Sequence, residues 1–214
     1  ILKQAHVING GTRKRNVHFI TEKGRKLCNK KEKDSIIANI QGNPPNNIEL
    51  IGRENELKEI DSILEKENIL YVSGIAGIGK TAILRYYAEQ KSKNGMKIKW
   101  YSATSISSPK TIVETWLKMN KLSSDIDDLI ASIRNEANNN LLIIDNFDQI
   151  QIRFKKEVEE FITKLCNLKC QIIISSRPPL PKNKNKNIEI NGLKRSSAIK
   201  LLDGFNSTET NNIV

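Results

Sequence analysis

From residue 57 onward, short apolar-rich runs alternate with stretches in which apolar residues recur every three or four positions. Short runs rich in apolar residues are typical of strands that are buried on both faces of a sheet. They occur at residues 69–72, 98–102, 141–144, 171–175 and 188–190. The stretches between them carry apolar residues three or four positions apart, as amphipathic helices do. Strands that alternate with helices are typical of a parallel sheet with crossover connections, so we expect an α/β fold.

The same pattern predicts how the chain is organised. Residues 1–34 have a short alternating apolar pattern. Residues 35–50 hold the turn-rich stretch Gly42-Asn43-Pro44-Pro45, which is typical of a linker. The α/β domain is expected to span residues 51–191. Residues 192–214 begin with a helical stripe and end in a polar tail. They are either the start of a truncated helical subdomain, which we favour, or a frayed tail.

A glycine-rich segment lies between the first of these strands and the next helical stripe. It is a complete G-x-x-x-x-G-K-[ST] phosphate loop, followed by the first residue of the helix: Gly74, Ile75, Ala76, Gly77, Ile78, Gly79, Lys80, Thr81 and Ala82. Its glycines let successive main-chain N–H groups surround a phosphate, and the helix N-terminus adds partial positive charge. Lys80 can reach the β- and γ-phosphates, and the Thr81 hydroxyl can bind Mg²⁺. The alternative is a chance glycine-rich turn, but the strand–loop–helix context favours a site for ATP or ADP.

A second element of the same chemistry ends the apolar run 141–144. There Asp145 would meet the phosphate loop, because the carboxyl ends of parallel strands lie at one edge of a sheet. A carboxylate in this position typically holds Mg²⁺ through water. Thr81 and Asp145 are therefore the predicted metal-binding residues.

Hydrolysis of ATP also needs a group that orients and polarises water. Asn146 directly follows the predicted metal carboxylate but cannot take a proton, which leaves Asp148 as the nearby acid. Asp148 could be the catalytic base, or it could only cap the following helix. Arg177 follows the strand 171–175 and could neutralise charge on a γ-phosphate, or form a surface ion pair. Lys80, Asp148 and Arg177 are the candidate catalytic residues of an ATP hydrolase, whose turnover would be slow and regulated, or switched off.

The net charge of +11 is unevenly distributed along the chain. Residues 1–35 contain ten Lys or Arg and three Asp or Glu, a net charge of +7, which leaves +4 for the rest. Such an asymmetry indicates a segment that faces nucleic acid. A solvated basic tail would have the same composition.

Cysteine content and hydropathy favour a cytoplasmic location. The three cysteines are Cys28, Cys166 and Cys170, an odd and sparse set that indicates a reducing compartment and free thiols. No apolar run approaches the ~20 residues that span a bilayer, so no membrane partner is expected.

Four motifs resemble the STAND class of signal-transducing P-loop ATPases, relatives of AAA+ proteins that include the NACHT and NB-ARC branches. They are Ile51-Gly52-Arg53-Glu54 with Leu57, Gly74–Thr81, Leu141–Asp148 and Ile172–Arg177. The spacing of Asp145 and Asp148 is similar to that of the NACHT branch. Asn146 departs from this branch, in which a small residue follows the metal carboxylate.

The resemblance implies a five-stranded parallel P-loop core with the strand order 5-1-4-3-2 and flanking helices. It implies that Ile51, Gly52 and Arg53 lie against the base and sugar of the nucleotide, and that a helical subdomain follows the core. It also implies a switch that is closed with ADP and open with ATP, and that assembles into a homo-oligomer in the ATP state.

Residues 3–27 resemble the wing half of a winged helix-turn-helix module. Val7-Ile8 and residues 17–19 suit the two strands of a hairpin, and the basic turn between them would be the wing tip. The resemblance implies contacts with double-stranded DNA from three residues, Arg13, Lys14 and Arg15. The recognition helix of such a module would lie mostly before residue 1.

Three functions are compatible with these features. The first is a transcriptional or signalling regulator in which an ATP-binding switch controls an N-terminal DNA-binding winged helix. The second is an AAA+-like ATPase of DNA replication or repair, in which the winged helix normally follows the ATPase rather than preceding it. The third is a defence or scaffold ATPase whose N-terminal module binds protein.

Overall fold

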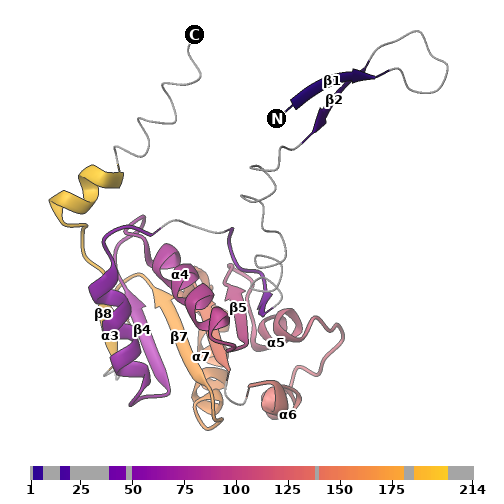
Figure 1. Cartoon of the computed structure of the whole chain (residues 1–214). Helices are drawn as coiled ribbons and strands as arrows, with labels where there is room; N and C mark the ends of the chain where they lie inside the picture. The colour runs from indigo at the N-terminus through magenta and orange to yellow at the C-terminus, as the bar shows by residue number, and fades with distance from the viewer. Residues whose placement is uncertain are drawn as a thin grey trace. The chain divides into compact units, whose positions relative to one another are not determined.

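The computed structural model describes residues 2–6, 15–19, 39–46, 50–137, 140–180 and 186–201, with side chains left out for residues 2–6, 15–19 and 136–137. The chain divides into two compact units, Ile1–Ala38 and Asn39–Val214 (Figure 1). Each unit is described by itself.

The first unit contains a two-stranded antiparallel sheet. β1 (Leu2–His6) pairs with β2 (Arg15–Phe19), with His6 opposite Arg15 and Leu2 opposite Phe19. This pairing agrees with the hairpin expected in this segment, although β1 lies before the predicted strand at Val7-Ile8, which is outside the described residues. The backbone of these two strands alone does not identify a winged helix.

The second unit is built on a parallel sheet of six strands. Their order is β3 (Ile40–Gly42), β5 (Ile98–Ser102), β6 (Leu141–Asp145), β7 (Gln171–Ser176), β4 (Ile69–Ser73) and β8 (Asn187–Glu189). Every pairing between neighbouring strands is parallel. The five strands expected from the sequence follow the order 5-1-4-3-2, with the phosphate-loop strand second. The expected strand number of five is wrong, because β3 adds a sixth strand beside β5.

β3 lies within the stretch that the sequence indicates as a linker. Gly42 has φ +107°, and a Cβ there would collide with the carbonyl oxygen of Trp100, so only glycine fits this close approach. Lys99 Nζ, on a side chain that is 2% exposed, donates to Gln41 Oε1 at 2.6 Å and to the Trp116 carbonyl at 3.2 Å. The turn-forming residues around Gly42 therefore predict a linker, whereas the structure has a short edge strand there. A side-chain hydrogen bond between Gln41 and Lys99 fixes this strand to the core.

The segment after β3 is also fastened to the core. The main-chain N–H of Ser102 donates to Asn43 Oδ1 at 2.8 Å, and the Asn43 N–H donates to the Trp100 carbonyl at 3.2 Å. Arg85 Nε, on the helix that follows the phosphate loop, donates to the Pro45 carbonyl at 2.9 Å. Residues 39–46 are thus part of the folded core.

Helices cover both faces of this sheet (Figure 1). α3 (Glu54–Leu64) and α4 (Lys80–Lys93) pack on one face, and α5 (Pro109–Leu117), α6 (Ile126–Ala137) and α7 (Ile152–Leu165) pack on the other. A short 3-10 helix, η1 (Phe147–Gln149), follows β6, and residues 195–201 form a further helical segment. These helices lie where the sequence predicts helical stripes.

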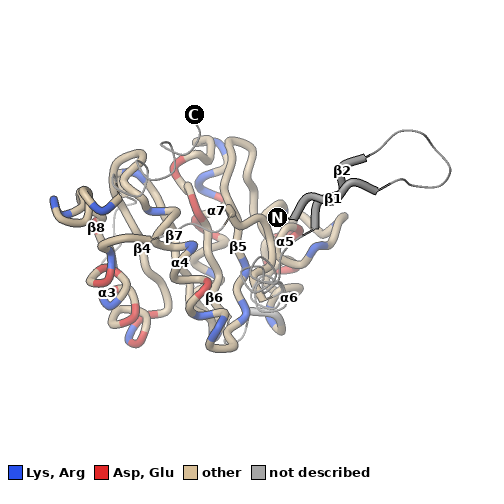
Figure 2. The backbone as a smooth tube through the Cα atoms, turned by 45° about the horizontal axis from the view of Figure 1, so that its top comes forward, with Lys and Arg blue, Asp and Glu red and all other residues tan. Residues whose placement is uncertain are grey.

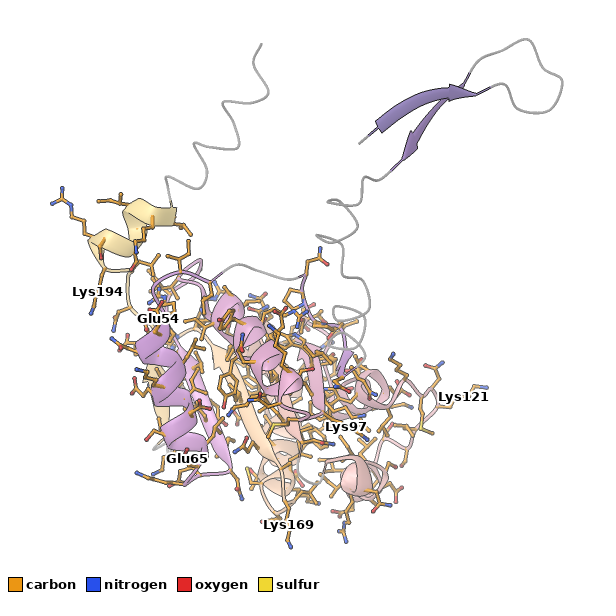
Figure 3. All side chains as sticks on the ribbon, in the orientation of Figure 1. Glu54, Glu65, Lys97, Lys121, Lys169 and Lys194 are labelled. Atoms are coloured by element: carbon orange, nitrogen blue, oxygen red, sulfur yellow. The ribbon has the colours of Figure 1, made fainter. Side chains whose placement is uncertain are left out.

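The central strand β6 shows why the core has two parts. Leu141 and Ile143 pack with α3 and α4, whereas Leu142 and Ile144 pack with α5, α6 and α7. Because side chains alternate along a strand, a continuous apolar run can fill both cores at once. Glu54, Glu65 and Lys169 lie at the periphery of this unit, away from both cores (Figure 3). Among the described helices, none is long and apolar enough to cross a membrane.

Replacement of Phe161 by alanine tests the core under α7. Phe161 is fully buried, and its ring centroid lies 6.4 Å from that of Trp116. We expect Phe161→Ala to lower the free energy of unfolding by about 3–5 kcal/mol in denaturant titrations, because the lost contacts leave a cavity. Ile152→Ala on the same helix is the control: its side chain is 90% exposed, and the expected change is within about 0.5 kcal/mol. Equal effects of the two substitutions would contradict this description of the core.

Candidate functional site

The loop between β4 and α4 has the geometry of an anion-binding turn. Gly79 is the N-cap of α4, has φ +102° and provides no side-chain cap. The first turn of α4 also lacks acidic residues. The first N–H groups of the helix therefore have no capping side chain, and they remain available to an anion. At the other end of the loop, Gly74 has no room for a side chain, since a Cβ there would lie 2.8 Å from the Ile190 carbonyl oxygen.

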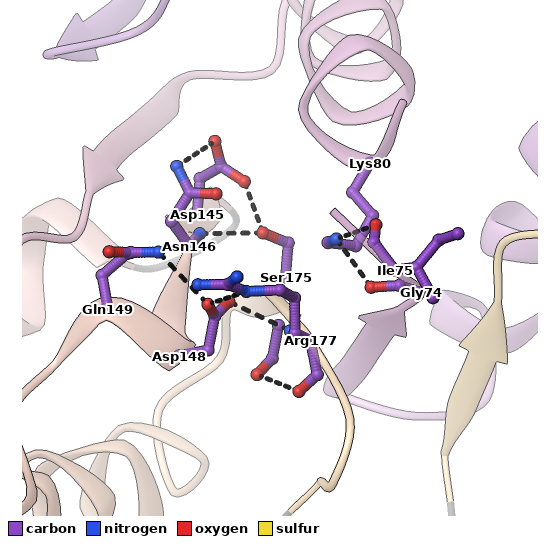
Figure 4. A network of polar contacts seen from close by, with 10 residues as sticks. Gly74, Ile75, Lys80, Asp145, Asn146, Asp148, Gln149, Ser175 and Arg177 are labelled. Atoms are coloured by element: carbon purple, nitrogen blue, oxygen red, sulfur yellow. Dashed lines mark hydrogen bonds and ion pairs between the residues drawn. The ribbon is translucent and has the colours of Figure 1, made fainter. Parts of the chain in front are cut away.

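Lys80 folds back over this loop (Figure 4). Its Nζ donates to the Gly74 carbonyl at 2.8 Å and to the Ile75 carbonyl at 3.0 Å, and its side chain is 7% exposed. Burial lowers the pKa of Lys80, while the nearby Asp148 and Asp145 carboxylates oppose the shift. Two main-chain carbonyls thus hold the ammonium at the loop.

Asp145 lies at the carboxyl end of β6 and is 1% exposed. The Thr81 hydroxyl, at the start of α4, donates to Asp145 Oδ2 at 2.9 Å. Burial raises the pKa of Asp145, and hydrogen bonds from Ser175, Thr81 and the Asn146 N–H oppose that rise. A hydroxyl beside a carboxylate supplies hard oxygen ligands, and Mg²⁺ uses few protein ligands besides water and phosphate. Thr81 and Asp145 therefore fit a magnesium site.

Ser175 is a residue of this site that the sequence analysis missed. Its hydroxyl donates to Asp145 Oδ1 and accepts from the Asn146 N–H at 2.8 Å (Figure 4). The sequence could have identified Ser175 through the expected strand order, which places the ends of β6 and β7 next to each other. Ile144 pairs with Ile174 in the neighbouring strand, so the next residues along both strands, Asp145 and Ser175, follow side by side.

Asp148 and Arg177 come together from the segments that follow β6 and β7. Asp148 lies in η1 and accepts from Arg177 Nε at 2.6 Å and from the Arg177 N–H at 3.0 Å. Burial alone would raise the pKa of Asp148, but the hydrogen bonds and charge of Arg177 outweigh it and hold the pKa below its ordinary value. Asp148 does not cap α7, whose N-cap is Gln151 and has no side-chain cap, so that alternative is wrong.

The ion pair of Arg177 was the alternative to a role in phosphate binding. The structure contains this ion pair, and the Arg177 side chain is 48% exposed while that of Asp148 is 16% exposed. Both residues nevertheless line a cavity of about 400 Å³ beside the phosphate loop. The cavity is lined by Ala76, Gly77, Gly79, Lys80, Thr81, Ala82, Asn146, Asp148, Gln149 and Arg177. Arg177 therefore forms the surface ion pair and also lines the cavity, where it could contact a phosphate.

Ile51, Gly52 and Arg53 do not line this cavity. Arg53 is 5% exposed; its Nη2 donates to the Ile78 carbonyl at 3.1 Å, and its Nη1 pairs with Glu56 at 2.7 Å. Gly52 has φ +69°, and a Cβ there would collide with the side chain of Ser197. This segment therefore supports the phosphate loop and contacts the helical segment 195–201.

The remaining predicted residues belong to the first unit. Arg13 and Lys14 lie outside the described residues, and Arg15 begins β2 but is described by its backbone alone. Where side chains are described, no group of three or more His, Cys, Asp or Glu gathers into a metal cluster.

Comparison with known proteins agrees with this geometry at the level of the fold. A Walker-type ATPase of Pyrococcus abyssi aligns with a TM-score of 0.50 and 12% identity, over 77% of this chain and 60% of that chain. Drosophila ORC bound to DNA aligns with a TM-score of 0.54 and 16% identity, over 71% of this chain and 46% of that one. The Aeropyrum pernix ORC1 protein in complex with DNA gives a TM-score of 0.53 and 15% identity, over 73% and 49%.

This chain therefore spans about half to three fifths of the length of these solved chains. No curated protein matches the sequence. The family profile described as an AAA domain matches residues 63–182, from the end of α3 to beyond β7. This match includes the phosphate loop, Asp145 and Arg177, and it covers more than half of the 214 residues. The chain thus belongs to the AAA domain family of P-loop ATPases.

Proposed function

We propose that this protein is an ATP-binding switch that takes ATP or ADP with Mg²⁺ into the cavity beside the phosphate loop. One observation carries the proposal: the Thr81 hydroxyl bonds to the buried Asp145 carboxylate at 2.9 Å, next to a lysine already held at the loop. Membership of the AAA domain family supports it, since such ATPases typically bind nucleotide with Mg²⁺.

Each residue then has a defined part in nucleotide binding. The Lys80 ammonium would exchange two carbonyl acceptors for phosphate oxygens, which carry full negative charge and accept stronger hydrogen bonds. The uncapped N–H groups of α4 would bind the same phosphates. Thr81 and Asp145 would hold Mg²⁺, which when bound neutralises and orients the phosphoryl group.

Hydrolysis is proposed to be slow because Arg177 restrains the base. The guanidinium holds the pKa of Asp148 below its ordinary value, which makes the carboxylate a weaker base. A γ-phosphate would compete with Asp148 for Arg177 and release the carboxylate toward water. Asn146, which lines the same cavity, has no basic group that could replace Asp148.

A STAND-type switch is supported by the contacts of the Gly52-Arg53 segment. Gly52 packs against Ser197 of the helical segment, and Arg53 binds the Ile78 carbonyl inside the phosphate loop. A shift of the loop on nucleotide exchange would reach residues 195–201 through these two contacts. Opening in the ATP state and assembly into a homo-oligomer are parts of this proposal.

The proposal extends to DNA through the first unit. Residues 1–35 hold +7 of the net charge of +11. Basic and acidic positions are interspersed over the second unit (Figure 2). Two of the similar solved structures are bound to DNA. The basic charge of the first unit favours a partner that is DNA rather than the protein partner of a defence ATPase. A regulator in which ATP controls DNA binding is preferred over a replication ATPase because the basic segment precedes the ATPase domain, whereas the winged helix of such replication ATPases normally follows it.

Nucleotide binding is tested with Lys80→Ala in the whole chain. Loss of charge-assisted hydrogen bonds worth about 1.5–3 kcal/mol should weaken binding of labelled ADP with Mg²⁺ by about 10- to 100-fold. Lys93→Ala, at the other end of α4, removes the same charge away from the cavity and should bind as the wild type does. Equal affinities of all three proteins would contradict the proposed site.

The role of Asp148 is tested by single-turnover hydrolysis of ATP. Asp148→Asn keeps the size of the side chain but cannot accept the proton, so the rate should fall at least about 100-fold. ATP should still bind, because the substitution frees Arg177 for the γ-phosphate. Asp127→Asn, on exposed surface of α6, is the matched control with an unchanged rate. A normal rate in Asp148→Asn would remove Asp148 as the base without affecting nucleotide binding.

DNA binding is tested by the salt dependence of duplex affinity. Replacing Arg13, Lys14 and Arg15 with alanine should lower the slope of log affinity against log salt by about 2–3, because each phosphate contact releases about 0.9 counterion. A variant with alanine at Lys97, Lys121 and Lys169, which lie at the periphery of the second unit (Figure 3), loses the same charge and should keep the slope. If both variants lower the slope equally, DNA recognition does not reside in the wing tip.

A further inference from the structure

Ser175 occupies a central position among the polar groups of the site. It is fully buried, and its one hydroxyl links the end of β7 to the Asp145 carboxylate and to the Asn146 main chain. We propose that Ser175 is a positioning residue that orients Asp145 for Mg²⁺. This inference rests on the proposed binding of nucleotide with Mg²⁺.

The two oxygens of Asp145 have different partners. Oδ1 accepts from the Ser175 hydroxyl, whereas Oδ2 accepts from the Thr81 hydroxyl at 2.9 Å and from Asn146 Nδ2 at 3.4 Å. The oxygen on the Thr81 side faces the start of α4 and is the one suited to a metal. Ser175 occupies the other oxygen and thereby prevents the carboxylate from rotating about its terminal bond.

The second hydrogen bond of Ser175 fixes the main chain after β6. Asn146 has φ +60°, a left-handed conformation that asparagine tolerates better than most residues, and its N–H donates to Ser175 Oγ at 2.8 Å. η1, which carries Asp148, starts directly after this turn. One hydroxyl thus holds both the carboxylate and the turn that leads to Asp148.

A hydroxyl can perform both tasks at this position. A serine or threonine oxygen donates one hydrogen bond and accepts others, whereas alanine offers neither. Ser175→Ala would leave one oxygen of a 1% exposed carboxylate and one main-chain N–H without this partner. Groups that orient a metal ligand typically contribute about 10- to 100-fold to metal affinity.

The neighbouring residue provides a matched control. Ser176 lies in the same strand and is 3% exposed, but its hydroxyl donates to the Arg177 carbonyl at 2.9 Å. Ser176→Ala removes the same atom from an almost equally buried place without touching Asp145. A difference in Mg²⁺ requirement between Ser175→Ala and Ser176→Ala would therefore come from the lost hydrogen bond to the Asp145 carboxylate.

The experiment is a titration of labelled ADP into the whole chain at a series of Mg²⁺ concentrations and in EDTA. Ser175→Ala should need about 10- to 100-fold more Mg²⁺ for half of the metal-dependent gain in affinity. Its affinity in EDTA should stay within about threefold of the wild type, because the phosphate loop is unchanged. Ser175→Thr, which keeps the hydroxyl, and Ser176→Ala should need the same Mg²⁺ as the wild type.

The outcomes separate the inference from the proposed function. A wild-type Mg²⁺ requirement in Ser175→Ala, with binding still lost in Lys80→Ala, overturns the role of Ser175 and leaves the nucleotide site standing. An equal loss of affinity with Mg²⁺ and in EDTA shows a structural role only and also overturns it. Absence of ADP binding by the wild type at every Mg²⁺ concentration refutes the proposed function itself.

If Ser175→Ala does not fold, Ser175→Cys keeps the shape with a weaker donor, and a wild-type Mg²⁺ requirement there overturns the inference.

Discussion

An ionised carboxylate that is 1% exposed is stable only where hydrogen bonds replace the water it has lost, and Asp145 is such a group. Its partners come from three segments: Thr81 at the start of α4, Ser175 at the end of β7 and the turn at Asn146. Burial raises the pKa of this carboxyl, so each of these hydrogen bonds helps to keep it charged. The need to satisfy one buried charge therefore ties the phosphate loop to two central strands.

The order of the strands makes this arrangement possible. β6 and β4 lie on either side of β7, so the carboxyl ends of all three strands meet at one edge of the sheet. The phosphate loop, Asn146 and Arg177 follow these three ends and line a single cavity, although about 70 residues separate Ala76 from Asn146 in sequence. Asp145 lies behind this lining, where it is bonded to Thr81. Parallel pairing throughout this sheet is what gives every strand the same direction.

Much of the core and of the phosphate site could be predicted because their signals are local. The phosphate loop is contiguous, and Asp145 ends a purely apolar run, so neither needs tertiary information. β3 could not be predicted, since the turn-rich sequence around Gly42 becomes a strand only through the edge that β5 offers. Ser175 was missed because a serine in a strand is unremarkable until the register of β6 against β7 places it beside Asp145. Arg53 was expected near the nucleotide by resemblance, and its hydrogen bond to the Ile78 carbonyl could not be predicted because 25 positions separate the two residues in sequence.

The attachment of residues 39–46 has a mechanical consequence. β3 runs parallel to β5, so tension along the strand axis would load its cross-strand hydrogen bonds together in shear rather than break them one at a time. Beyond this strand, the Pro45 carbonyl is bonded to Arg85, five residues after Lys80 on the same helix. Force applied to the chain at Asn39 would therefore be resisted by the β3–β5 hydrogen bonds and transmitted to α4 through Arg85. Residues 39–46 are thus a rigid attachment point of the second unit.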